Sequence, residues 1–298
     1  MTPPAGRRAG RQPKPSRLDV RKTYKLYIGG AFPRSESGRV YPVTAPDGEI
    51  IARPSRASRK DLRDAVRAAR QAFPGWSGAT AYNRGQVLYR VAELMEGRRE
   101  QFAEELRRSG GKRMDREVTA AIDRWVWYAG WSDKLHHVLG TVNPVAGPYF
   151  NFTFPEPTGV VGIIAPEEPA LLGLVSRVAP AVISGNTVVM LASERRPLPA
   201  VTLSEVLATS DVPGGVINVL TGYKKELAPW LASHMDVNAI DLTGAPGHLL
   251  AELQAATAGN VKRVVQDGRG DFFADSAESP YAMADFMEMK TVWHPMGA

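Results

Sequence analysis

The sequence contains no cysteine. This absence excludes disulfide bonds, thiolate metal sites and a cysteine nucleophile within these 298 residues. No histidine cluster has the spacing of metal ligands, and the adjacent His136 and His137 would point apart on a helix. No segment approaches the ~20 apolar residues that a membrane-spanning helix needs. We therefore expect neither a bound metal nor contact with a membrane.

Signature loops of common nucleotide and hydrolase sites are also lacking, among them G-x-G-x-x-G, the Walker loop and G-x-S-x-G. The net charge of +6 suggests an acidic partner, but residues 1–25 hold eight basic side chains and one acid, a net +7. The remaining chain is close to neutral, at −1. We therefore expect no nucleic-acid binding by the body. The basic, proline-rich segment 1–23 is predicted to be disordered, with weak contact to an anionic surface as the alternative.

The first half of the chain predicts short strands followed by helices. Tight turns at Gly29-Gly30 and Pro46–Gly48 break an alternating pattern over residues 24–51. Ser58 and Asp61 have the spacing of a capping box, and apolar residues follow at helical intervals until Pro74-Gly75. Helices are predicted over 59–73, 83–95, 98–108 and 115–136, where Trp125 is expected to pack in the core.

The second half alternates strand and helix. The near-continuous apolar run Val160–Ile164 is typical of a buried strand in a parallel sheet. Further strands are predicted over 186–190, 216–220, 239–242 and 261–265, each separated from the next by a helix. This pattern predicts an α/β fold with a doubly wound, mostly parallel, Rossmann-like sheet, whose ligands lie at the carboxyl ends of the strands. The aromatic segment 149–156 predicts an exposed strand, and Pro155 suggests that it lies at a sheet edge.

An ordered series of motifs resembles the aldehyde dehydrogenase superfamily over most of residues 24–265. The motifs are Lys25–Gly30 (KLYIGG), Glu156–Gly162 (EPTGVVG), Gly185–Met190 (GNTVVM), Pro213–Asn218 (PGGVIN) and Leu242–Gly244 (LTG). The chain is similar to the degenerate second module of the two-module branch of that superfamily.

The resemblance implies aldehyde oxidation with NAD(P)⁺, in which a cysteine attacks the aldehyde, a glutamate activates water and an asparagine helps to stabilise the oxyanion. None of these catalytic groups is intact here. The family's P-W-N-F-P falls on residues 166–170, so that Glu168 replaces the asparagine, and a carboxylate cannot stabilise developing negative charge. The family's E-L-G-G falls on residues 267–270, so that Asp267 keeps a carboxylate on a shorter side chain.

The resemblance also implies a cofactor site with two losses. Its residues would be Ile164, Ala165, Pro166, Leu191, Glu194, Gly222, Thr243, Gly244 and Ala245. Leu191 stands where the family has a lysine that holds the adenosine ribose, while the accompanying Glu194 remains. Ala245 replaces a serine beside the pyrophosphate. NAD binding is therefore expected to be weak or lost.

The cysteine-bearing domain of the family does not appear, and residues 281–293 resemble the family's last oligomerisation strand. The predicted organisation is therefore a tail at 1–23, a cofactor-type domain formed by 24–140 and 159–265, a connector at 266–280 in place of the catalytic domain, and an oligomerisation arm formed by 141–158 and 281–298.

The hypothesis that follows is a non-catalytic, cytoplasmic subunit. It would assemble with a full-length NAD-dependent aldehyde dehydrogenase through residues 149–156 and 288–293 and support its assembly or activity. A homodimer is the alternative assembly. An NAD(P)-dependent aldehyde oxidoreductase, or a nucleotide-binding sensor, acting alone are the alternative functions.

Overall fold

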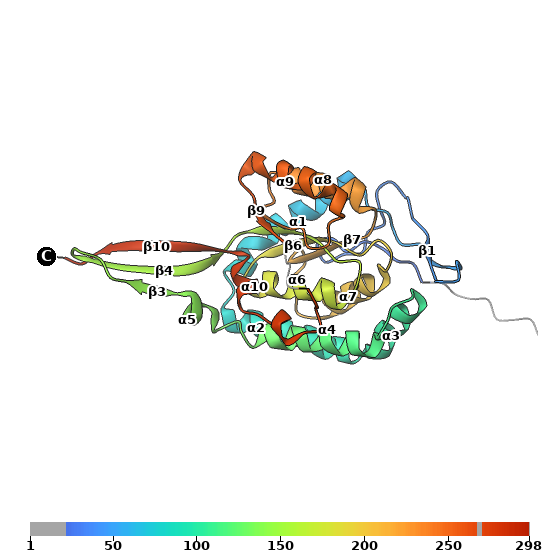
Figure 1. Cartoon of the computed structure of the whole chain (residues 1–298), viewed down its shortest axis with the longest axis horizontal. Coiled ribbons are helices and arrows are strands. Elements are labelled where there is room, and N and C mark those ends of the chain that lie inside the picture. Colours follow the sequence, from blue (N-terminus) through green and yellow to red (C-terminus); the bar gives the residue numbers. More distant parts are fainter. Residues whose placement is uncertain (1–21, 267–269, 298) are drawn as a thin grey trace, which may run out of the picture.

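The computed structural model describes residues 22–266 and 270–297. The predicted tail, apart from Lys22 and Thr23, and Asp267 lie outside the described residues. A body built on a sheet carries a long arm that projects from one side (Figure 1).

The body contains a five-stranded parallel sheet, and the predicted fold class is confirmed. Its order is β7-β6-β5-β8-β9. The strands are β5 (Val160–Ile164), β6 (Thr187–Leu191), β7 (Ile217–Leu220), β8 (Ala239–Asp241) and β9 (Arg263–Val265). The chain adds β6 and β7 on one side of β5, then crosses back to add β8 and β9 on the other. The order of the strands therefore reverses between β5 and β8.

Helices cover both faces of this sheet, and alternate side chains of β5 show how. Val161 and Ile163 pack against one set of helices, whereas Val160 and Ile164 pack against the other. The first face carries α6 (Leu172–Ile183) and α7 (Leu198–Thr209), backed by α2 (Ala81–Glu96), α3 (Arg99–Arg108) and α4 (Met114–Ala129). The second carries α1 (Arg59–Ser77), α8 (Lys224–Ser233) and α9 (Leu250–Thr257) (Figure 1).

Outside the arm, the remaining elements are short. They are β1 (Val43–Thr44), β2 (Ile50–Ala52), α5 (Leu135–Leu139), α10 (Tyr281–Ala284) and the 3₁₀ turns η1 (Gly247–Leu249), η2 (Ala258–Asn260) and η3 (Asp275–Ala277). Among the described residues, no helix combines the length and the apolar character needed to cross a membrane.

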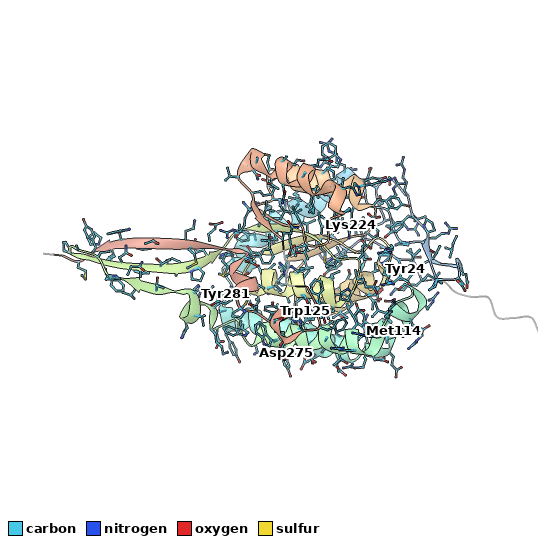
Figure 2. The ribbon with its side chains drawn as sticks, in the orientation of Figure 1. Tyr24, Met114, Trp125, Lys224, Asp275 and Tyr281 are labelled. Carbon is cyan, nitrogen blue, oxygen red and sulfur yellow. The ribbon has the colours of Figure 1, made fainter. Side chains whose placement is uncertain are left out.

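Two predicted helix boundaries are wrong. α1 does not stop at Pro74 but continues to Ser77, because Trp76 is buried and its indole N–H donates to the carbonyl of Val182 at 2.9 Å. This tertiary contact holds the last turn in place. The helix predicted to run to residue 136 ends at Ala129, where a turn at Gly130 redirects the chain toward α5. Trp125 lies within the helical layer, as predicted (Figure 2).

The arm is a three-stranded antiparallel sheet of order β10-β4-β3. It consists of β3 (Thr141–Asn143), β4 (Tyr149–Pro157) and β10 (Met287–Pro295), and β10 pairs with β4 along its full length. The expectation that residues 149–156 form an edge strand is therefore wrong. Pro155 is tolerated in the central strand because its side of the backbone faces α5 beyond the end of β3, where its carbonyl accepts a hydrogen bond from His136 at 3.0 Å.

Candidate functional site

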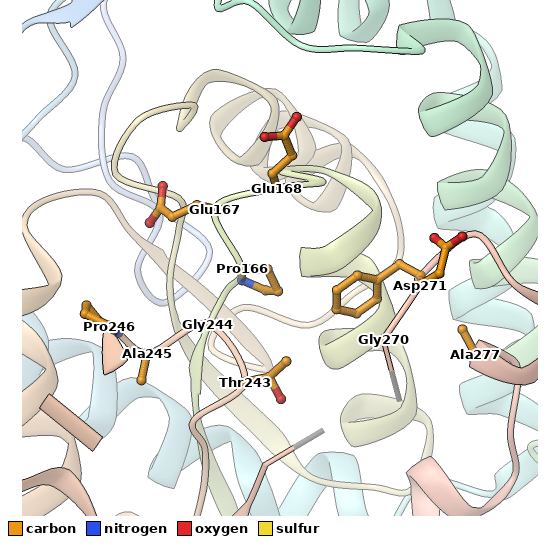
Figure 3. A pocket seen from close by; sticks show the side chains of 11 residues that line it. Pro166, Glu167, Glu168, Thr243, Gly244, Ala245, Pro246, Gly270, Asp271 and Ala277 are labelled. Atoms are coloured by element: carbon orange, nitrogen blue, oxygen red, sulfur yellow. The ribbon is translucent and has the colours of Figure 1, made fainter. Parts of the chain in front are cut away.

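The candidate site lies at the carboxyl edge of the sheet, at the reversal between β5 and β8, which is where doubly wound folds bind ligands. The chain leaves β5 through Ala165 and leaves β8 through Thr243 and Gly244. A side chain at Gly244 would place its Cβ 2.1 Å from the carbonyl oxygen of Ala165, so only glycine allows this approach. We call the cavity beside this point, about 610 Å³ in volume, the crevice. Its walls are formed by Pro166, Glu167, Glu168, Thr243, Gly244, Ala245, Pro246, Gly270, Asp271, Phe272 and Ala277 (Figure 3).

The structure brings only some of the predicted cofactor residues to this crevice. Four line it, namely Pro166, Thr243, Gly244 and Ala245. Ile164 and Ala165 are buried at the end of β5, and Leu191 is buried in the core at the end of β6. Glu194 and Gly222 lie beyond β6 and β7, where Gly222 packs against the backbone of Ala57.

Behind the wall of the crevice, against Glu167, lies a buried ammonium group that the sequence did not indicate. Lys224 is the first residue of α8, and its side chain is 1% exposed. Its Nζ donates to the carbonyls of Ala165 at 2.6 Å and Gly244 at 3.0 Å, and forms an ion pair with Glu167. An ammonium has three N–H donors, so these partners satisfy all of them. The cation thus sits at the reversal point of the sheet (Figure 2).

Glu167 is held by the loop that follows β6 as well as by Lys224. Its carboxylate accepts hydrogen bonds from the hydroxyl of Ser193 at 2.7 Å and from the N–H groups of Glu194 and Arg195, both at 3.2 Å. Burial acts to raise the pKa of Glu167, but the Lys224 ammonium and these donors outweigh it and lower the pKa below its ordinary value. The carboxylate is therefore ionised and fully engaged.

Helix N-termini around the crevice are also occupied by the chain's own carboxylates. Glu194 accepts the N–H of Lys224 at the start of α8. Glu117, on α4, accepts the N–H groups of Leu171 at 2.7 Å and Leu172 at 3.3 Å at the start of α6, and burial raises its pKa. Such termini are ready anion sites when they are free. Here a carboxyl oxygen of the chain already accepts hydrogen bonds at both, and Pro246 removes one N–H at the start of η1.

The connector forms one wall of the crevice and is fixed to the body by Arg124. This α4 side chain is 3% exposed and donates to the carbonyls of Phe272 at 3.0 Å and Ala277 at 3.2 Å. It also lies 3.5 Å from the carboxylate of Glu278. The described connector residues are therefore packed against the helical layer.

Comparison with known proteins agrees with this architecture. The aldehyde dehydrogenase family model matches residues 32–271. The chain belongs to the aldehyde dehydrogenase family. Human retinal dehydrogenase 2 is 37% identical over 280 residues, which cover 89% of this chain and 53% of that protein.

Solved structures give the same result. HpcC from Thermus thermophilus superposes with a TM-score of 0.78 and 30% identity, over 82% of this chain and 47% of that one. An NAD⁺ complex of an aldehyde dehydrogenase from Bacillus cereus gives a TM-score of 0.76 and 26% identity, over 82% and 50%. The chain spans about half the length of the relatives that it matches.

In this aldehyde dehydrogenase family member, the residue predicted to replace the oxyanion asparagine lines the crevice but directs its carboxylate away from the ends of β5 and β8 (Figure 3). The carboxylate of Glu168 points away from Gly244 (Figure 3) and lies 3.2 Å from the guanidinium of Arg196. Arg196 also donates to the carbonyls of Ser109 at 3.1 Å and Gly110 at 2.9 Å. The described residues contain no group of three His, Asp or Glu side chains placed to hold a metal.

Sequence reasoning missed Lys224, Glu167, Glu117 and Pro246. Lys224 belongs to an ordinary Lys-Lys pair at a helix start, and nothing local distinguishes its buried side chain from the exposed Lys225. The available signal was Glu167 itself, a carboxylate one residue past a proline at the end of the first parallel strand. A carboxylate that is buried at that position needs a positively charged or hydrogen-bonding partner.

Proposed function

We propose that this chain is a non-catalytic aldehyde dehydrogenase subunit that assembles, through its arm, with a complete NAD-dependent aldehyde dehydrogenase and supports its assembly or activity. The observation that carries the proposal is a contrast within one chain. The charged groups beside the crevice are bonded to one another, whereas the arm leaves a long strand edge and an aromatic face uncovered.

The proposal that the chain is non-catalytic rests on the chemistry of aldehyde oxidation. That reaction needs a nucleophile, an oxyanion donor and a bound nicotinamide at one carbon. The sequence supplies no cysteine. Glu168 is paired with Arg196, and the charged side chains that line the crevice are all carboxylates. We therefore expect the isolated chain to produce no NADH when supplied with an aldehyde.

The proposal of a protein partner rests on the two faces of the arm. Phe150, Phe152 and Phe154 form a continuous row on one face, with ring centroids 5.3 and 5.9 Å apart. Val142 and Val292 lie opposite Phe152 on the neighbouring strands and therefore share its face. Val142 is 69% exposed and Phe150 is 43% exposed. Such a face is covered in a stable assembly.

Only the centre of the opposite face is polar and internally bonded, and the exposed side chains of Tyr149, Met289 and Trp293 lie around it. The side-chain amide of Asn143 donates to Asn151 at 2.6 Å and to Thr153 at 2.9 Å, and the hydroxyls of Thr153 and Thr291 lie 2.8 Å apart. A partner is therefore expected along the edge of β10 and on the face of the phenylalanine row, which no bonded polar cluster interrupts. Within the described residues, β10 pairs only with β4, so its other edge can add to a partner's sheet.

This arrangement refines how the two predicted segments would act. Residues 288–293 can contribute backbone hydrogen bonds from an edge strand. Residues 149–156 lie in the central strand and can contribute only side chains.

Co-expression with a full-length aldehyde dehydrogenase from the same cells tests the proposal. Size-exclusion chromatography with light scattering is expected to show a heteromer containing both chains. A chain that lacks residues 288–298 is expected to remain folded and to lose the complex. The truncation begins at 288 because Met283 and Phe286 are fully buried and belong to the core.

Two results would contradict the proposal. One is a stable homodimer that ignores every co-expressed homologue, formed by pairing the arms of two copies. The other is aldehyde-dependent NADH production by the purified chain above a heat-inactivated control, which would favour an enzyme acting alone.

A further inference from the structure

The crevice lacks predicted cofactor ligands, and in addition the charged groups beside it are bonded to one another around a single residue, Lys224. The side chain and the backbone of Lys224 together join several loops at the carboxyl edge of the sheet. Its Nζ contacts Ala165 and Glu167 after β5 and Gly244 after β8, while its backbone N–H is bonded to Glu194 after β6. One residue therefore connects the loops on both sides of the point where the strand order reverses.

We propose that Lys224 and Glu167 form a closed anion site, in which the Glu167 carboxylate permanently occupies the position that a phosphate group would take on the Lys224 ammonium. This inference deepens the proposed loss of cofactor binding and rests on it. It adds that the Glu167 carboxylate is what blocks a phosphate group, and that the Lys224 ammonium is the cation to which a phosphate would bind.

Three features of the geometry support a closed anion site. The carboxylate of Glu167 accepts from an ammonium, a hydroxyl and two backbone N–H groups, which is the donor set that phosphate oxygens use. The site lies where doubly wound sheets bind ligands. Glu167 also lines the open crevice, so an anion that replaced its carboxylate would reach Lys224 from solvent.

Charge explains why the site stays closed in the unaltered chain. An incoming pyrophosphate would have to displace a carboxylate that is covalently part of the loop and therefore always at high effective concentration. It would also meet the like charges of Glu167, Glu168 and Asp271 on the crevice walls. Replacing the lost serine at Ala245 would leave both obstacles in place.

Glu167→Gln tests the inference, because it removes the resident charge while keeping the length and shape of the side chain. Isothermal titration calorimetry at low ionic strength with inorganic pyrophosphate, and separately with ADP-ribose, is expected to show no binding by the unaltered chain. The Glu167→Gln variant is expected to bind pyrophosphate measurably, at least tenfold more tightly than the weakest binding that the titration of the unaltered chain would detect.

Glu168→Gln is the matched control. It removes the same charge one residue away, from a carboxylate that pairs with Arg196 rather than Lys224. We expect a much smaller gain in pyrophosphate binding than in Glu167→Gln, because Glu168 repels the ligand but does not occupy the Lys224 ammonium. Equal gains in the two variants, no gain in Glu167→Gln, or binding by the unaltered chain would each overturn the inference.

A second measurement uses the unaltered chain and does not depend on any variant folding. Brief acetylation with acetic anhydride, followed by peptide mass spectrometry, compares Lys224 with its exposed neighbour Lys225. Lys224 is expected to react at least tenfold more slowly. Similar rates for the two lysines would mean that the ammonium is not held in the closed site.

Discussion

The crevice and the arm of this chain satisfy their polar groups in opposite ways. At the carboxyl end of β5, Lys224, Glu167 and Glu194 use one another and the surrounding backbone, so that little is left for a ligand. The arm joins the amino end of the same strand, and among the described residues nothing pairs with the outer edge of β10 or covers the phenylalanine row. At one end of β5 the polar groups are paired with one another, whereas the arm at the other end leaves a strand edge and aromatic side chains uncovered.

On the proposal of a closed anion site, the fold would be kept for its shape and not for binding a cofactor. The charges at the crevice now join loops, as a bound cofactor would otherwise do. Selection for a partner would then act on the arm alone. We therefore expect variants at the crevice to change stability and variants on the arm to change assembly.

The largest effect is expected from Lys224→Met, which removes the ammonium and keeps the apolar stem. It leaves Glu167 and two carbonyl groups without their donor, and breaking one side of a buried ion pair costs about 3 kcal/mol of unfolding free energy. Urea denaturation followed by circular dichroism measures this loss. Lys225→Met is the control and should change stability little. Equal stability of the two variants would mean that the crevice is not held together by Lys224.

A smaller effect, and of another kind, is expected from Phe152→Asp at the centre of the aromatic row. A charge there should weaken the heteromer by about 2 kcal/mol, the size of a central interface residue, without shifting the melting temperature of the body. Thr291→Asp, in the polar centre of the opposite face, introduces the same charge and should retain the complex. Co-purification yields measure both. The comparison between crevice and arm fails if both variants lose the complex equally.

The smallest effect concerns a buried carboxyl group away from both regions. Burial raises the pKa of Glu105, on α3, from 4.5 to about 7, although Thr202 donates to it at 2.8 Å and Lys22 lies 3.6 Å away. Because the folded-state pKa is the higher one, ionisation of Glu105 should reduce stability as pH rises from about 4.5 to about 7, and the penalty should persist above that range.

Glu105→Gln should therefore flatten this part of the stability profile and raise the unfolding free energy at pH 8 by on the order of 1 kcal/mol. Denaturation at a series of pH values gives the measurement. Glu104→Gln, at the exposed neighbouring position, provides the control and should follow the unaltered profile. A Glu105→Gln profile that still falls between pH 4.5 and 7 would assign the effect to another group.

The sequence was sufficient for the sheet and insufficient for the crevice, and particular residues explain why. Val160–Ile164 reveals a buried strand because five adjacent apolar residues carry the signal themselves. Lys224 gives no such signal, since its partners Ala165 and Gly244 lie 59 and 20 residues away. The same limit explains α1, where a contact between Trp76 and Val182 extends the helix past a proline. Local pattern predicts elements, whereas distant contacts decide which charges become buried.

The register of β10 on β4 has a consequence for how the chain folds. Thr153 and Thr291, which face each other across the two strands, are 138 residues apart, and every strand of the parallel sheet lies between them. Pairing over such a separation carries a large loop-closure entropy and is slow unless the intervening chain is already compact. During synthesis, the parallel sheet can therefore form before β10 emerges from the ribosome. The pairing of β10 with β4 can thus take place on a chain whose parallel sheet has already folded. This order limits mispairing of β10 between nascent chains.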